Sequence, residues 1–141
     1  MKESTNLHKN IEIFSLYWAL VKNQQRLGIV SNIDDKLEDA ILAFTLGETQ
    51  EALNILEALS KKNAASIDVW RALAEVHLSH GDFDSAEEAC NKALGLNPDD
   101  LTSTVSLARI LVKKGDKDGA EEASAKARVL GWKEELAEEN E

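Results

Sequence analysis

A repeat with a period of 34 residues constrains the fold of this chain more than any other feature of its sequence. Glycines stand at Gly47, Gly81 and Gly115, and an acidic residue follows each of them. Small residues keep the same step in two further series, at Ala40, Ala74 and Ala108 and at Ala52, Ala86 and Ala120. A fixed period of this length predicts a stack of similar units, because one such unit cannot bury its apolar face alone.

Three units follow from this frame, at residues 33–66, 67–100 and 101–134, and each is expected to form two helices joined by a turn. Gly81 and Gly115 can adopt the left-handed conformation that ends a helix. The expected capping residues are two capping boxes and one cap for the third unit: Asp84 with Glu87, Asp118 with Glu121, and Asp99 or Asp100. Alanine, leucine and glutamate dominate the composition, which also favours helices.

The middle unit carries the clearest pattern of residue types: Trp70, Leu73, Ala74, His77, Gly81, Phe83, Ala86, Cys90, Ala93, Leu96 and Pro98. This pattern closely resembles the tetratricopeptide repeat. The resemblance covers all three units and is weakest in the first. It implies an all-α protein, a right-handed α-solenoid of helix-turn-helix repeats.

The resemblance also implies a concave groove, lined by the first helix of each unit, that holds a peptide or protein segment. Carried over position by position, the groove residues are Leu37, Ile41, Phe44, Arg71, Glu75, Leu78, Val105, Arg109, Val112 and Lys113. One end of this set is apolar and the other is basic, which suits a ligand with an apolar anchor and a carboxylate. The alternative is that the basic side chains are solvated, or paired with Glu75 and Asp68.

The two ends of the chain lie outside the repeat frame. Residues 1–32 are expected to form an extra N-terminal helix and a linker, because Trp18 stands where a further repeat would need a small residue. The apolar face of this helix spans about 220°, more than capping the first unit requires. It can cover that unit, enter the groove, form a homodimer or bind a partner through Ile11, Phe14, Trp18 and Val21. Residues 135–141 are expected to form an acidic tail.

Little in the sequence indicates catalysis. There is no glycine-rich phosphate loop and no hydrolase or metalloprotease motif. His77 and His80 are three residues apart, but the repeat frame points them in different directions and offers no third metal ligand. Cys90 occupies a core position, where an inert thiol is expected. We therefore predict no catalytic residues, no metal site, no cofactor and no enzymatic activity.

The net charge and the hydropathy of the chain indicate which class of partner it binds and in which compartment it resides. The formal net charge of −10 argues against nucleic acid, whose binding needs a basic surface. No apolar stretch approaches the roughly 18 residues of a membrane helix. The single cysteine excludes an internal disulfide framework, and the start of the chain lacks the layout of a signal peptide. These features predict a cytoplasmic protein without a membrane span.

The leading functional hypothesis is a non-enzymatic adaptor or scaffold that binds a peptide or protein segment in the groove of the repeats. The alternative is a small chaperone, similar in architecture to those of type III secretion. Such a chaperone would hold an apolar client and could form a homodimer through its N-terminal helix. The sequence identifies neither the partner nor the pathway.

Overall fold

The structure, a computed structural model, describes residues 32–140 and shows them as six α-helices without a β-strand. The expected N-terminal helix and its face of Ile11, Phe14, Trp18 and Val21 lie outside the described residues. The helices are α2 (Asn32–Thr45), α3 (Thr49–Lys62), α4 (Ile67–His80), α5 (Phe83–Leu96), α6 (Leu101–Lys114) and α7 (Lys117–Glu139).

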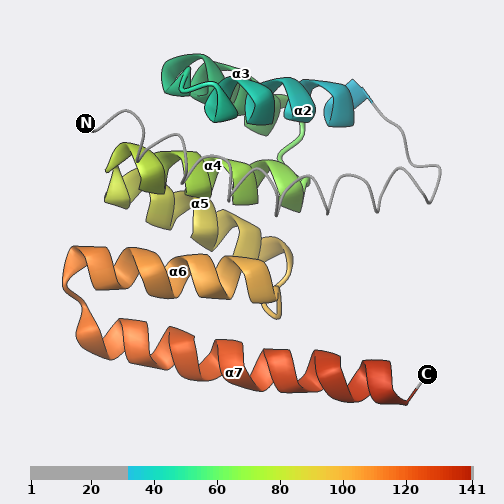
Figure 1. The fold of residues 1–141 in the computed structure, drawn as a ribbon, viewed down its shortest axis with the longest axis vertical. Coiled ribbons are helices and arrows are strands. Elements are labelled where there is room, and N and C mark those ends of the chain that lie inside the picture. Colours follow the sequence, from blue (N-terminus) through green and yellow to red (C-terminus); the bar gives the residue numbers. More distant parts are fainter. Residues whose placement is uncertain (1–31, 141) are drawn as a thin grey trace.

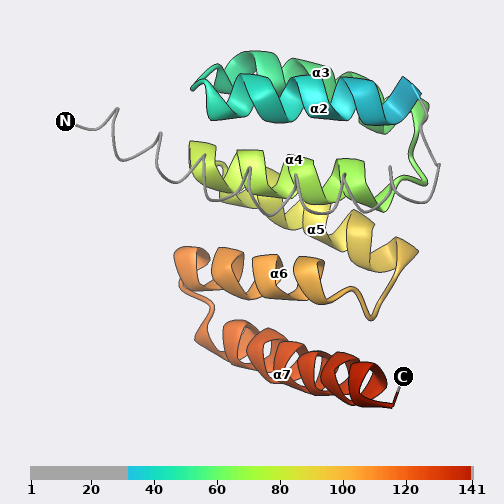
Figure 2. The same cartoon turned by 45° about the vertical axis from the view of Figure 1, so that its right-hand side comes forward.

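These helices form three helix-turn-helix pairs that are stacked along one axis (Figures 1 and 2). In both views α2 and α3 form the first layer, α4 and α5 the second, and α6 and α7 the third. The first helices also contact one another, α2 with α4 and α4 with α6. They share one face, named here the first-helix face. The expected all-α solenoid is confirmed.

Glycine makes the turn inside each pair possible. Gly47, Gly81 and Gly115 have φ angles of +86°, +86° and +82°, in the left-handed region that is costly for other residues. At the end of α4, the backbone N–H groups of Gly81 and Asp82 donate hydrogen bonds to carbonyls of the last turn, those of Leu78 and His77. The glycine period therefore sets where the first helices end.

The predicted capping boxes at the second helices are wrong. Asp82 and Asp116, directly after the left-handed glycines, are the N-cap residues of α5 and α7, and the Asp116 carboxylate accepts a hydrogen bond of 3.0 Å from the N–H of Gly119. Asp84 and Asp118 lie inside the first turn of α5 and α7. There the negative carboxylate stabilises the helix by interacting with the positive end of its dipole. The predicted cap at Asp100 is confirmed, since its side chain accepts a bond from the N–H of Ser103.

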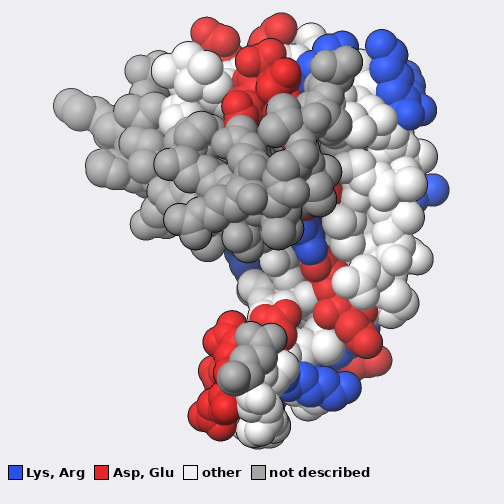
Figure 3. All heavy atoms as spheres, turned by 90° about the vertical axis from the view of Figure 1, so that its right-hand side faces the viewer, with Lys and Arg blue, Asp and Glu red and all other residues white. Residues whose placement is uncertain are grey.

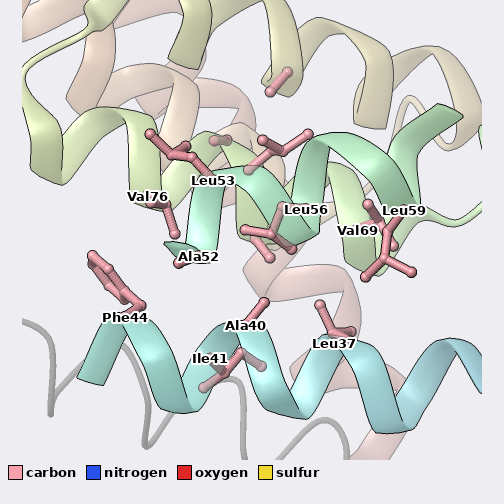
Figure 4. Close-up of a cluster of buried hydrophobic side chains, with 14 of the residues drawn as sticks. Leu37, Ala40, Ile41, Phe44, Ala52, Leu53, Leu56, Leu59, Val69 and Val76 are labelled. Atoms are coloured by element: carbon pink, nitrogen blue, oxygen red, sulfur yellow. The ribbon is translucent and has the colours of Figure 1, made fainter. Parts of the chain in front are cut away.

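Small residues let the paired helices approach closely. Ala40, Ala52, Ala74 and Ala86 are almost wholly buried. In Figure 4, Leu37 and Ala40 on α2 point toward Leu56 on α3. One hydrophobic cluster extends through the first two pairs and reaches Ile110 on α6. The repeated alanines thus explain why the units pack as a continuous solenoid.

The last helix is longer than the others. α7 has 23 residues, whereas α2, α3, α4, α5 and α6 have 14 each. Much of the acidic segment predicted as a tail, residues 135–141, therefore continues α7 as far as Glu139. The end of α7 extends past α6 (Figure 1), and every residue from Trp132 to Asn140 is exposed.

Candidate protein-binding surface

The apolar residues assigned to the first unit of the groove belong to the core. The residues Leu37, Ile41 and Phe44 are 1%, 5% and 2% exposed, and all three are part of the main hydrophobic cluster. Leu78 on α4 is half-buried and packs against the same cluster. In this structure these side chains stabilise the solenoid, and the accessible part of the predicted site lies on α6.

Arg71 on α4 is held by two carboxylates of the same chain. Its Nε donates a hydrogen bond of 2.9 Å to Oδ2 of Asp100, and its second terminal nitrogen, Nη2, binds the other oxygen of that carboxylate. Its Nη1 donates a bond of 2.8 Å to Asp68. The side chain is only 15% exposed. Arg71 thus joins α4 to the start of α6. For this residue the structure therefore supports the alternative in which a basic side chain is paired with acids of the same chain.

Asp100 is the centre of this polar cluster. Besides Arg71, it accepts hydrogen bonds from the backbone N–H and the hydroxyl of Ser103, at 3.0 and 2.5 Å. Burial raises the pKa of Asp100, but the bonds from Arg71 and Ser103 outweigh burial and bring the pKa below its usual value of 3.8. The carboxylate is therefore charged at neutral pH, and it holds two successive units together.

A second polar cluster links α4 to the middle of α6. The buried carboxylate of Glu75 accepts a bond of 2.5 Å from the hydroxyl of Ser106 and bonds of 3.1 Å from Nη1 of Arg109. The Arg109 side chain is nevertheless 52% exposed. A guanidinium has five N–H donors, so Arg109 can bind Glu75 through Nη1 and still present donors to a ligand.

The remaining predicted groove residues form an exposed stripe on α6. Val105, Arg109, Val112 and Lys113 are all exposed, and their spacing of four, three and one residues puts them on one side of the helix. Arg109 contacts Glu75 of α4, which places this stripe on the first-helix face. Named here the α6 stripe, it combines two apolar and two basic side chains.

Neither Cys90 nor His77 has the setting of a catalytic group. Burial, and after it the charge of Glu75, raises the pKa of Cys90 to about 12, so its thiol is protonated at neutral pH. Within residues 32–140, Nδ1 of His77 has no hydrogen-bond partner, and burial lowers the pKa of this histidine. The described residues contain no group of three potential metal ligands.

Sequence reasoning missed the roles of Asp100 and Ser106 on this face. Asp100 was predicted as a cap, but its ion pair with Arg71 joins residues 29 apart. Ser106 is bonded to Glu75, 31 residues away. The pairing of a buried serine with a buried glutamate gives no local pattern in the sequence, because only the stacking of the units brings the two residues together.

The paired helices and the left-handed glycines define an α-solenoid of helix-turn-helix repeats. The family model described as "Tetratricopeptide repeat" matches residues 43–102 and 77–128, more than half of the chain. The chain belongs to the tetratricopeptide repeat family, whose fold is that of a protein–protein interaction module.

Solved structures agree with this fold. A crystal structure of MamA has a TM-score of 0.71 and 19% identity, covering 96% of this chain and 84% of MamA. A MamA fragment from Desulfovibrio magneticus RS-1 has a TM-score of 0.68 and 19% identity, covering 92% of this chain and 70% of the fragment.

A third similar structure is PcrH in complex with the chaperone binding region of PopB. It has a TM-score of 0.67 and 19% identity, covering 72% of this chain and 84% of the PcrH chain. No curated protein matches the chain by sequence. Among the described helices, none is both long enough and apolar enough to cross a membrane.

Proposed function

We propose that this protein is a non-enzymatic adaptor that binds a protein segment along its first-helix face, with the α6 stripe as the main contact. The observation that carries this proposal is the exposed set of Val105, Arg109, Val112 and Lys113. Two exposed valines beside two cations favour a partner segment with apolar side chains and a carboxylate. Lys113 attracts the acidic group, and Arg109 can bind it through two hydrogen bonds.

The polar clusters behind the stripe support this role. Glu75, which itself accepts a hydrogen bond from Ser106, holds Arg109 from one side, and this limits the freedom that the arginine side chain loses on binding. The Arg71–Asp100 pair fixes the start of α6 relative to α4. The stripe therefore lies on a rigid support, as is typical of a preorganised binding surface.

The test replaces the exposed valines with acids. Val105→Asp combined with Val112→Asp adds negative charge where an acidic, apolar partner segment would lie. The matched control is Leu96→Asp on α5, which also changes an exposed apolar residue to an acid. Proteins captured from the source cells by the tagged wild-type chain should be reduced at least tenfold with the double variant and retained by the control. Equal capture by both variants would contradict the assignment of the stripe.

The second candidate is a small chaperone that holds an apolar segment of a client. The similarity to PcrH, which was solved with the chaperone binding region of PopB, supports it. This function predicts that the client precipitates when expressed alone and stays in solution with this protein. An adaptor would leave its partner's solubility unchanged, so co-expression of a captured partner separates the two candidates.

Three further properties remain predictions. A cytoplasmic location and the lack of enzymatic activity follow from the composition and the motifs. The face of Ile11, Phe14, Trp18 and Val21 is proposed as a surface for a homodimer or a partner. The change of Trp18 to alanine should abolish such a dimer in sedimentation experiments, and an unchanged mass would exclude this face.

A further inference from the structure

The exposed end of α7 carries an apolar stripe that has no role in the proposed groove. The side chains of Val129, Trp132 and Leu136 are 47%, 64% and 58% exposed. Their spacing of three and four residues puts them on one side of the helix. Glu135 and Glu139 border this side, because they lie three residues after Trp132 and Leu136. We name this surface the α7 end.

A hollow of about 390 Å³ lies at the opposite end of the solenoid, between α2 and α3. Ile55, Ala58 and Leu59 give it an apolar floor, while Lys36, Lys62 and Asp39 are charged residues of its lining. Figure 3 shows basic and acidic side chains together at the α2–α3 end and again at the α7 end, so the two lysines of the hollow are a local feature of its lining. The volume is typical of pockets that accept a bulky group.

These two surfaces combine apolar side chains with charges of opposite sign, the glutamates of the α7 end and the two lysines of the hollow. One offers an exposed tryptophan and leucine beside two glutamates, and the other offers an apolar hollow whose lining also contains two lysines and one aspartate. We propose that the α7 end of one copy of this chain docks into the α2–α3 hollow of a second copy. Trp132 fills the hollow, as tryptophan does in many interface hot spots, while Glu135 and Glu139 face Lys36 and Lys62.

The physics of solenoids supports a second copy as the occupant. A terminal repeat normally needs a polar outer surface for solubility. An exposed apolar side chain such as Trp132 instead favours association of that surface with another protein surface. Because the two surfaces differ and lie at opposite ends, the contact is head-to-tail and each added copy exposes the same two ends again. The contact is small, so the chains are short, reversible and weakened by salt.

The first experiment measures the mean mass by sedimentation as the concentration of the full chain rises to its solubility limit. The mass should increase above the monomer's 15.5 kDa without levelling off at a dimer, and salt should reduce the increase. Trp132→Ala with Leu136→Ala should abolish it, and so should Lys36→Glu with Lys62→Glu. All four residues are exposed, so these variants should keep the wild-type circular dichroism spectrum. The control Leu96→Ala should associate like the wild type.

The second experiment mixes the two blocked variants. Both variants also carry Trp18→Ala, which removes any dimer through the N-terminal face. Each then lacks one end surface and should be monomeric alone, but their equimolar mixture should form a dimer that does not grow further. Glu135→Lys with Glu139→Lys, introduced into the Lys36→Glu and Lys62→Glu variant, should restore longer chains. A wild-type chain that stays monomeric overturns the proposal. So does association that persists in either variant alone, as a symmetric dimer through another surface would show.

Discussion

The ion pair between Arg71 and Asp100 offers the most informative test of how the repeats are held together. The change Arg71→Met removes the guanidinium and keeps much of the apolar volume. It leaves Asp100 charged and 6% exposed, with hydrogen bonds only from Ser103. Removing one partner of a buried ion pair costs about 3–5 kcal/mol. Because Arg71 is 15% exposed and Ser103 still binds Asp100, we expect a loss of about 2–3 kcal/mol in the free energy of unfolding.

Urea unfolding followed by circular dichroism measures this loss. With a slope of about 2 kcal/mol per molar urea, the midpoint should fall by about 1 M or slightly more. The control Arg128→Met changes an exposed arginine on α7 and should shift the free energy by less than about 0.5 kcal/mol.

A double-mutant cycle isolates the pair itself. Asp100→Asn keeps an oxygen for the cap and removes the charge. Combined with Arg71→Met, it should show a coupling energy of about 1–3 kcal/mol. A midpoint that is unchanged in Arg71→Met, together with no coupling, would refute the structural role. Arg71 would then be assigned again to the residues that bind a ligand in the groove.

Two further predictions concern the turns and a buried histidine. Gly81→Ala should destabilise the protein by about 1–2 kcal/mol, because alanine is strained at a φ of +86° although no atom lies near its added carbon. The matched change Gly95→Ala, inside α5 and also in open space, should stabilise the protein by about 0.5–1 kcal/mol in the same urea assay, and a loss at both sites would contradict the argument. Because burial lowers the pKa of His77 below its usual 6.5, the unfolded chain binds a proton first as the pH falls. The free energy of unfolding should therefore decline as the pH drops from 6.5 through the lower folded-state pKa, and His77→Gln should remove this decline. An identical pH profile for the variant would exclude His77 as its source.

The fold of the described repeats could be predicted from local rules. A glycine every 34 residues ends each first helix, and alanines with the same step mark where paired helices meet. Both signals depend only on backbone conformation and side-chain size. The same local rules predicted the cap of the third unit at Asp99 or Asp100, and the structure has it at Asp100. The capping boxes at Asp84 and Asp118 were misplaced, because the residue directly after each left-handed glycine already serves as the cap.

The candidate site could be predicted only in part, because its chemistry depends on which units touch. By itself, the sequence determined the helix pairs and the helix that carries each groove residue. Only the tertiary structure decided that Leu37, Ile41 and Phe44 are buried and that Arg71 is bound to Asp100. It also left Val105, Arg109, Val112 and Lys113 exposed on α6. The reason is physical: turns and helix periodicity act over a few residues, whereas burial and ion pairing join side chains about one repeat apart.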